Sequence, residues 1–249
     1  MFTFEIRFYP KSFKEPFINE FDENMQWFIS CLYKNGQILK ECQNTVKFSG
    51  HYAYRVVAPE MDSLAKKHYN KYCRKFLSTV SEKSLKEPEV YFIGENYDAR
   101  ESCNCENTSH YILFFPYRYI EYPILCGDCH RSVPLYKLPK TYDDEEYHDV
   151  HCWEQVYRAC DTQFMNGIGE RHGYKMMSDP NSELSREGLR ICAYWEKCVK
   201  KSFYYFLFKY YKKNKSACPK CNESWVNKDK KMQYDYVCKK CRLVSNDMQ

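Results

Sequence analysis

This chain of 249 residues contains no long hydrophobic run. Apolar stretches such as residues 111–115 have the length of a β-strand, whereas a membrane-spanning helix needs about 20 apolar residues. Residues 1–8 alternate between apolar and polar like a strand and lack the basic and apolar regions of a signal peptide. The sequence also has no internal repeat and no low-complexity linker. We therefore expect a globular protein of the cytoplasm, with no part in a membrane.

Cysteine, in contrast, is abundant, with 15 residues. Structural disulfides are rare in the reducing cytoplasm, so close pairs of thiols there indicate metal ligands or redox groups. Eight of the cysteines fall into four close pairs, and the other seven are scattered. The search for a functional site therefore begins with the four pairs.

Aromatic residues are also frequent, at 18% of the chain, with 24 Tyr and 16 Phe. A core and a sheet rich in rings would explain this content, and so would a surface on which nucleic-acid bases stack. The first interpretation is favoured because the sequence contains no recognisable motif for binding single strands.

The hydrophobic pattern predicts a fold of the α+β class. Apolar residues recur at helical spacing over residues 17–32 and 61–76. Residues 46–48 and 52–56 flank Ser49-Gly50 like the arms of a hairpin. Further strands are expected near residues 89–93 and 110–115. We therefore predict a mainly antiparallel amino-terminal sheet with two helices packed against it.

The second half of the chain is predicted to be largely helical. One helix is expected to start near Thr141, with acidic residues 143–146 in its first turn, where they favour the positive end of the helix dipole. Another is expected to start at Ser178-Asp179-Pro180, with Asp179 as its cap. Residues 202–208 are apolar on both faces and predict an interior strand.

These elements predict three domains. Residues 1–141 would form an α/β body with an embedded four-cysteine zinc knuckle at 103–129. Residues 142–212 would form a helical segment and a strand packed on that body. Residues 213–249 would form a carboxy-terminal zinc ribbon.

The strongest motif lies in that last segment. Cys218-x2-Cys221 is followed after sixteen residues by Cys238-x2-Cys241. Each C-x2-C turn offers two thiolates at a spacing that suits one tetrahedral Zn²⁺. A module this small buries too little surface to fold alone, so the metal would supply folding energy. Because four sulfur ligands leave no open coordination position, this zinc is expected to be structural.

A second motif lies in the middle of the chain. Cys103-x-Cys105 is followed after twenty residues by Cys126-x2-Cys129. The C-x2-C half predicts a zinc knuckle, and an intervening strand would bring the two halves together. We expect a second four-cysteine Zn²⁺ site. In the alternative, either Cys103 or Cys105 is idle and another ligand completes the site, with His130 as a candidate.

Evidence for catalysis is weak. His148 and Cys152 lie one helical turn apart and could form one face of a metal site, but such pairs are more often ordinary surface and core neighbours. Asp161, Glu170 and His172 could meet in a cleft around a glycine-flanked segment, but a helix end and a connecting loop explain that segment better. No nucleophile and base, and no open metal site, can be assigned. We therefore predict a protein that is not an enzyme.

Charge is distributed unevenly. Residues 200–249 carry 13 Lys and Arg against 4 Asp and Glu, a net charge of +9, whereas the whole chain carries +5. A basic tail on a mildly acidic body is typical of a module that binds a polyanion. A lysine-rich composition with solvated side chains would produce the same numbers, and the two interpretations stay open.

Four segments together resemble a known family. They are residues 125–139, residues 157–161, residues 177–185 and the tail from Cys218-Pro219-Lys220-Cys221 through residues 238–246. The family is a bacterial one of unknown function, domain of unknown function 2310, which carries a zinc ribbon and for which nucleic-acid binding is predicted. The resemblance runs from about Cys126 to the carboxyl terminus. It implies a bacterial, cytosolic setting and leaves the mechanism open.

The preferred function is therefore binding of nucleic acid by the ribbon, with basic residues on phosphates and aromatic residues available for stacking. The candidate contacts are Lys212, Lys213, Lys215, Lys220, Lys228, Lys230, Lys231, Lys239, Lys240, Arg242, Trp225, Tyr234 and Tyr236. The alternative is an immunity-type or regulatory protein that neutralises a toxin or another protein partner, because a tyrosine-rich surface suits protein interfaces.

Overall fold

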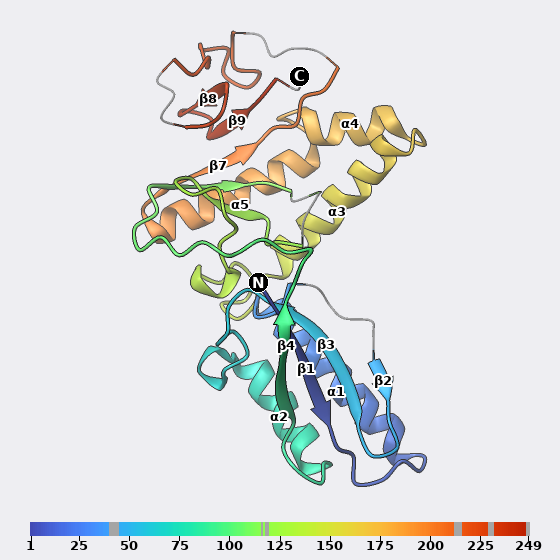
Figure 1. The fold of residues 1–249 in the computed structure, drawn as a ribbon. Helices are drawn as coiled ribbons and strands as arrows, with labels where there is room; N and C mark the ends of the chain where they lie inside the picture. Colours follow the sequence, from blue (N-terminus) through green and yellow to red (C-terminus); the bar gives the residue numbers. More distant parts are fainter. Residues whose placement is uncertain (40–44, 116, 118–119, 212–215, 229–231, 248–249) are drawn as a thin grey trace. The chain divides into compact units, whose positions relative to one another are not determined.

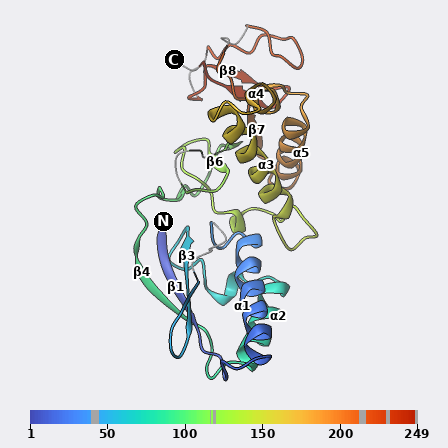
Figure 2. The ribbon, with the colours of Figure 1, turned by 90° about the vertical axis from the view of Figure 1, so that its right-hand side faces the viewer.

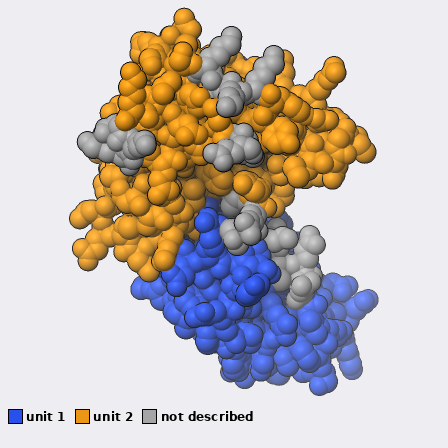
Figure 3. All heavy atoms as spheres, turned by 45° about the horizontal axis from the view of Figure 1, so that its top comes forward, with its two compact units in different colours: residues 1–102, 118–122, 134–147 blue, residues 103–117, 123–133, 148–249 orange. Residues whose placement is uncertain are grey.

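The computed structural model describes residues 1–39, 45–115, 117, 120–211, 216–228 and 232–247. They form two compact units (Figure 3). Unit 1 comprises residues 1–102, 118–122 and 134–147, and unit 2 comprises residues 103–117, 123–133 and 148–249.

Unit 1 contains six main elements in the order β-α-β-β-α-β: β1 (Phe2–Phe8), α1 (Phe17–Lys34), β2 (Thr45–Lys47), β3 (Tyr52–Ala58), α2 (Lys71–Glu82) and β4 (Glu89–Glu95). Two short 3-10 helices, η1 (Lys66–His68) and η2 (Leu135–Lys137), also belong to it. The strands form an antiparallel sheet in the order β2-β3-β1-β4. This connectivity is the ferredoxin-like, split β-α-β topology.

Helices α1 and α2 cover one face of this sheet (Figure 2). Phe4, Ile6 and Phe8 alternate along β1 and pack into a core with the apolar stripe of α1, which includes Phe21 and Phe28. The period of two in the strand and the spacing of three and four in the helix place these side chains on facing surfaces. The predicted antiparallel sheet with two helices is confirmed.

The opposite face of β1 carries charged residues. Glu5 pairs in register with Arg55 on β3 and with Tyr91 on β4. The Arg7 guanidinium lies 4.2 Å from the centroid of the Tyr91 ring and donates a hydrogen bond to Glu5. The ring of Tyr91 is therefore already covered by a cation, and this face does not resemble a row of aromatic side chains on which bases stack.

Unit 2 is built on a five-stranded sheet in the order β6-β5-β7-β9-β8. The strands are β5 (His110–Leu113), β6 (Ile124–Cys126), β7 (Ser202–Phe206), β8 (Tyr236–Cys238) and β9 (Leu243–Ser245), and the helices are α3 (His148–Met165), α4 (Glu170–Ser178) and α5 (Glu183–Val199). The interior strand predicted at residues 202–208 is the central strand β7. Figure 1 shows α5 alongside β7.

Both faces of β7 are covered. On one face, Phe203 meets Trp195 of α5, with ring centroids 5.6 Å apart, and Tyr205 lies 6.1 Å from Trp153 of α3. On the other face, Tyr204 packs with Ile112, Val244 and Tyr234, the last from the carboxy-terminal segment. Burial on both faces explains why β7 reads as one continuous apolar run.

The strand directions bring two cysteine motifs to the same end of this sheet. Strands β5, β7 and β9 are parallel, whereas the edge strands β6 and β8 run antiparallel to their neighbours. Strand β6 ends at Cys126 and β8 ends at Cys238. Both cysteines therefore lie at the end where β5, β7 and β9 begin.

Three helix starts differ from the prediction, each for a local reason. Helix α2 begins at Lys71 rather than near residue 61, because the Asn70 side chain caps it by accepting from the Cys73 N–H at 2.9 Å. Helix α3 begins at His148 rather than near Thr141, because Asp143 and Asp144 adopt positive φ angles of 50° and 54°.

Helix α5 begins after Ser182, whose side chain accepts from the Ser185 N–H, and not at Asp179. The segment expected to be a connecting loop after Gly167 instead starts helix α4, which follows Gly169 in the left-handed conformation. Because glycine has no Cβ atom, it adopts this conformation without a steric clash, and the chain can turn directly into a new helix.

The two units divide the chain differently from the three predicted domains. Residues 103–117 and 123–133, expected within the amino-terminal body, belong to unit 2 together with the carboxy-terminal ribbon. Strand β5 pairs with β7 in parallel, and that pairing of distant segments draws the central motif into unit 2. Within the described residues, no helix has both the length and the apolar character of a membrane span.

Candidate metal centres

The structure brings the four carboxy-terminal cysteines together. The sulfurs of Cys218, Cys221, Cys238 and Cys241 all lie within 4.8 Å of one another, and the Sγ atoms of Cys221 and Cys238 are 3.7 Å apart. Four sulfurs at about 2.3 Å from one tetrahedral Zn²⁺ would be separated by about 3.8 Å. The donor set and its spacing therefore fit a single metal ion.

The same backbone hydrogen bonds occur at two of the three C-x2-C turns. The backbone N–H of Cys218 donates to Glu223 O at 2.7 Å, and the N–H of Asn222 donates to Cys218 O at 2.9 Å. The N–H of Cys126 donates to Arg131 O at 2.9 Å, and the N–H of His130 donates to Cys126 O at 2.9 Å. In each case a tight turn holds both thiols on one side.

The residue that follows each turn is left-handed. His130, Asn222 and Arg242 come directly after Cys129, Cys221 and Cys241, and their φ angles are 56°, 63° and 55°. Non-glycine residues seldom adopt this conformation because Cβ crowds the carbonyl oxygen. Three such residues at equivalent positions show that the three turns share one conformation, which we call the knuckle.

The central four cysteines also converge. The sulfurs of Cys103, Cys105, Cys126 and Cys129 lie within 4.8 Å of one another, so both members of the C-x-C pair are in position to bind a metal. The N–H of Cys103 donates to Ser132 O at 2.8 Å, and this bond ties the C-x-C segment to the residues that follow the knuckle. His130, considered above as a substitute ligand, is not one of the four.

Hydrogen bonds stabilise thiolate in both clusters. Burial tends to raise the pKa of Cys126, but bonds from the Thr108 hydroxyl and from the N–H groups of Cys129 and Asp128 lower the pKa to about 7. The backbone N–H of Glu223 lowers the pKa of Cys221. Thiolate is the form that binds metal, and these two thiols favour it, whereas burial raises the pKa of Cys103 and of Cys241.

A glycine and a histidine pack tightly at the central knuckle. A Cβ atom on Gly127 would lie 2.2 Å from Nε2 of His110, so only glycine fits beneath this ring. The other ring nitrogen, Nδ1, lies 2.8 Å from the Ser109 hydroxyl, which donates to the Asp128 carboxylate. Since that hydroxyl has one proton, it accepts from Nδ1–H, and Nε2 carries the lone pair. The sequence motifs do not reveal this arrangement.

The candidate nucleic-acid contacts fall into several groups. Lys212, Lys213, Lys215, Lys230 and Lys231 lie outside the described residues. Arg242 binds Glu196, and Lys240 forms an ion pair with Glu223. Lys220, Lys228 and Lys239 are exposed, and none of them forms an ion pair with a described residue.

The aromatic candidates need correction. The Trp225 side chain is 1% exposed and packs against Tyr236 at 5.2 Å between ring centroids, and Tyr234 is 8% exposed. The Tyr236 hydroxyl donates to Asp247 at 2.9 Å. Trp225 therefore belongs to the core of the ribbon and Tyr234 packs in the cluster with Tyr204 of β7, and neither presents a face on which a base could stack.

The remaining clusters proposed from the sequence do not form larger metal sites. Cys152 Sγ lies 3.5 Å from His148 Nε2. Across the described ranges, the two four-cysteine groups are the only sets of three or more His, Cys, Asp or Glu side chains close enough to hold a metal. Asp161, Glu170 and His172 thus form no such group.

Three family models match separate segments of the chain. Residues 1–94 match domain of unknown function DUF8589, residues 105–208 match DUF2310, and residues 209–247 match DUF8594. The resemblance to DUF2310 is expected from about Cys126 to the carboxyl terminus, but the match begins earlier, at residue 105, and ends at residue 208. The carboxy-terminal ribbon matches DUF8594 instead.

Relatives also come from bacteria. An uncharacterized protein of Haemophilus influenzae is 28% identical over 202 residues, which cover 78% of this chain and 77% of the relative. A second uncharacterized protein from the same organism is 28% identical over 161 residues, covering 62% and 79%. No solved structure matches the chain. Residues 105–208, which include three of the central cysteines, thus match the DUF2310 family model, the family that the sequence motifs resemble.

Proposed function

We propose that this chain is a non-enzymatic protein that binds two structural Zn²⁺ ions and uses its carboxy-terminal ribbon to bind nucleic acid. The observation that supports it best is the pair of four-thiol clusters at one end of a single sheet. Four thiolates saturate a tetrahedral ion, so neither cluster has a position for substrate or water. The need for eight reduced thiols is consistent with a cytoplasmic location.

Charge supports nucleic acid as the partner. The last fifty residues carry a net charge of +9, and the exposed Lys220, Lys228 and Lys239 form no ion pair within the described part of the chain. Cations on a rigid scaffold bind phosphates and release condensed counterions. Arg242 and Lys240 contribute less, because each already binds a carboxylate.

The test is fluorescence anisotropy with labelled 20-nucleotide single-stranded DNA, single-stranded RNA and duplex DNA over a series of salt concentrations. We expect log K to fall linearly with log salt, with a slope of about 0.7 per single-strand phosphate contacted. The variant Lys220→Gln/Lys228→Gln/Lys239→Gln should bind more weakly with a smaller slope.

The matched control is Lys14→Gln/Lys75→Gln/Lys197→Gln, which removes the same charge from exposed lysines outside the ribbon. Equal losses of affinity in the two triple variants would show that net charge alone determines binding. No binding of any probe at low salt would refute the function.

A protein partner is the second candidate, and strand β4 favours it. This edge strand exposes Val90, Phe92 and Ile93 at 45%, 52% and 52%. An exposed apolar edge can pair with a strand from another chain. If it does so with a second copy, Phe92→Lys should convert a dimer into a monomer in sedimentation velocity. A monomeric wild type would remove self-pairing as an explanation.

A further inference from the structure

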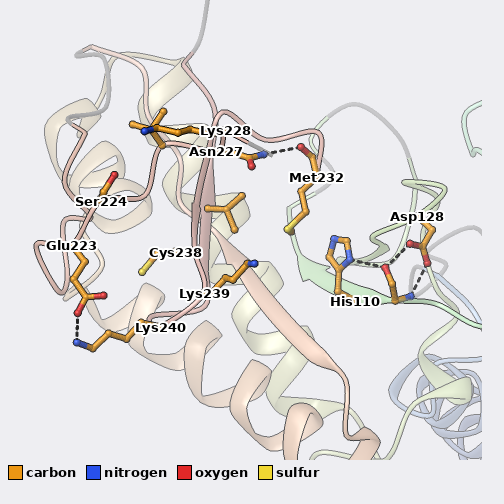
Figure 4. A pocket seen from close by; sticks show the side chains of 13 residues that line it. His110, Asp128, Glu223, Ser224, Asn227, Lys228, Met232, Cys238, Lys239 and Lys240 are labelled. Atoms are coloured by element: carbon orange, nitrogen blue, oxygen red, sulfur yellow. Dashed lines mark hydrogen bonds and ion pairs between the residues drawn. The ribbon is translucent and has the colours of Figure 1, made fainter. Parts of the chain in front are cut away.

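A cavity of about 800 Å³ lies beside the two metal centres in unit 2. We call it the knuckle pocket, and Figure 4 shows the side chains that line it. Ser109, His110 and Asp128 contribute from the central knuckle and the start of β5, and the ribbon contributes the rest. Pockets that hold small molecules measure roughly 300–1,000 Å³, so this one has room for a ligand.

The acidic groups of the knuckle pocket are already bound. Glu223 forms an ion pair with Lys240 (Figure 4). Asp128 accepts from the Ser109 hydroxyl and, at 2.7 Å, from the Ser109 N–H. Lys240 thus neutralises Glu223, whereas Asp128 keeps its negative charge, because its partners are neutral.

Two lysines of the pocket have no such partner. Lys228 and Lys239 line it, and neither forms an ion pair with any residue that the structure describes. The Lys239 side chain extends toward the side where Met232 and His110 lie (Figure 4). Together with Lys240, these lysines outnumber the two carboxylates of the lining by one, so the pocket favours an anion.

The pocket is also apolar in part. Val226, Val237 and Met232 line it, and Val237 and Met232 extend the core cluster formed with Tyr234 and Ile112. A flat, largely apolar ring would bury area against these side chains, and the neighbouring polar groups could bind its edge. Inorganic phosphate alone would leave this surface unused.

We propose that the knuckle pocket binds one nucleotide unit, with its phosphate near Lys239 and Lys228 and its base against Val226, Val237 and Met232. The nucleotide comes either from a single strand or from free solution. In a duplex the bases are stacked and paired, so a base must be unstacked to enter a pocket. The assignment of the ligand class rests on the function proposed above.

The experiment compares matched probes on the full-length, zinc-loaded protein. Anisotropy is measured for a labelled 12-nucleotide single strand, the same strand with abasic positions, and the corresponding duplex. Lys239→Gln removes a lysine from the knuckle pocket. Lys220→Gln removes an equal charge from the ribbon outside it. Zinc content is measured for each variant, so that a loss of binding cannot come from a loss of metal.

We expect Lys239→Gln to weaken single-strand binding about tenfold and Lys220→Gln to weaken it about twofold, since both lose one counterion contact but only Lys239 loses a pocket contact. Abasic positions should weaken binding about tenfold, the contribution of one base contact. The duplex should bind more weakly than the single strand.

Two results would refute nucleotide binding in the knuckle pocket and leave nucleic-acid binding by the ribbon intact. The first is equal affinity for the intact, abasic and duplex probes, and the second is an equal loss of affinity in the two lysine variants. Free nucleotides, titrated as AMP and UMP by calorimetry, separate the sources. AMP or UMP binding that Lys239→Gln abolishes, without binding of any oligonucleotide, would support a nucleotide site in the knuckle pocket and refute the proposed function. If neither kind of probe binds, both are refuted.

Discussion

Arg242 binds both carboxylate oxygens of Glu196, with Nη2–Oε1 at 2.6 Å and Nε–Oε2 at 2.8 Å. Arg242 directly follows the last cysteine of the ribbon, and Glu196 lies on α5. Bidentate pairs of this kind fix orientation as well as adding energy. The contact thus joins the ribbon to the helix that packs on β7, and it occupies a cation that would otherwise be available to phosphate.

Glu196→Gln should lower the free energy of unfolding by about 1 kcal/mol at pH 7, because the pair is partly exposed to solvent. The bond from Arg242 lowers the pKa of Glu196, so the stabilisation is present above the ordinary Glu value of 4.5 and is lost as pH falls through the depressed native value. Urea denaturation at pH 7 and pH 3.5 measures both. Glu95→Gln, an exposed site in unit 1, is the control, and a wild-type advantage that persists at low pH would contradict the assignment.

Removing single cysteines should separate the two metal centres. Cys221→Ser should lower zinc content by one equivalent and loosen the ribbon, leaving the remainder folded, because Cys221 is only half-buried. Cys126→Ser should be more damaging, because Cys126 is fully buried at the end of β6. Elemental analysis and circular dichroism measure the outcomes, with exposed Cys198→Ser as the control. Full zinc content in Cys221→Ser would refute the ligand set.

Gly127→Ala should destabilise unit 2 by about 2 kcal/mol, since the new methyl group would overlap the His110 ring. The matched control is Gly50→Ala, where a Cβ atom would meet nothing within 4 Å. The double variant Gly127→Ala/His110→Ala should recover part of the loss, because it removes the ring that clashes. Thermal denaturation measures all three, and a double variant no more stable than Gly127→Ala would show that the clash is not the cause.

Asn222 tests the knuckle conformation. Asn222→Gly should leave stability within about 0.5 kcal/mol, whereas Asn222→Val should cost about 1–2 kcal/mol, because a β-branched residue resists a φ of 63°. Asn222 is exposed, so little packing is altered by either change. Zinc-release rates in the presence of a chelator would show the same order. Equal behaviour of the two variants would argue against a left-handed residue there.

Lys140 should make the stability of unit 1 depend on pH. Its ammonium donates to Asn35 O at 3.1 Å and lies 4.3 Å from the Tyr147 ring centroid. Burial lowers its pKa to about 8. Between pH 8 and 10.5 the unfolded chain holds a proton that the native chain has released, so this group's contribution to stability rises with pH, by on the order of 2 kcal/mol.

The comparison of wild type with Lys140→Met isolates that contribution, because other titrating groups cancel in the difference. Lys14→Met, at an exposed position of unit 1, serves as the control. Denaturation between pH 7 and 10.5 gives the curve. A Lys140→Met difference that is flat over this range would show that Lys140 keeps its ordinary pKa.

Local spacing explains what could be predicted. Residues 17–32 show a strong helical period and form α1, and the run at residues 202–208 corresponds to the buried strand β7. The predicted helix starts were wrong where a capping side chain or a turn, and not the apolar period, sets the first residue of the helix, as with Asn70 and Asp143. Such contacts depend on one side chain and one backbone angle, and a periodic pattern carries no information about either.

The nucleic-acid residues show the same limit. A count of charged residues identifies the basic tail. It cannot show that Arg242 binds Glu196, which lies 46 positions earlier in the chain. An aromatic residue in a small module could be a stacking surface or its core, and Trp225 belongs to the core. Ion pairs and burial are properties of the folded chain.

The sequence by itself determined the carboxy-terminal four-cysteine set, because a metal site of this kind needs thiols at short fixed spacings that can be read without a fold. For the central set it left open whether both Cys103 and Cys105 take part, and the structure brings all four sulfurs together. The sequence also predicted the helices with long apolar stripes and the resemblance to DUF2310, and the family model matches residues 105–208. Only the tertiary structure decided that both sets belong to one unit, in which Asp128 of the central knuckle and Cys238 of the ribbon line the same cavity. The reason is that β5, β7 and β9 pair in parallel across about ninety and forty residues of intervening chain, and such long-range pairing leaves no local mark on the sequence.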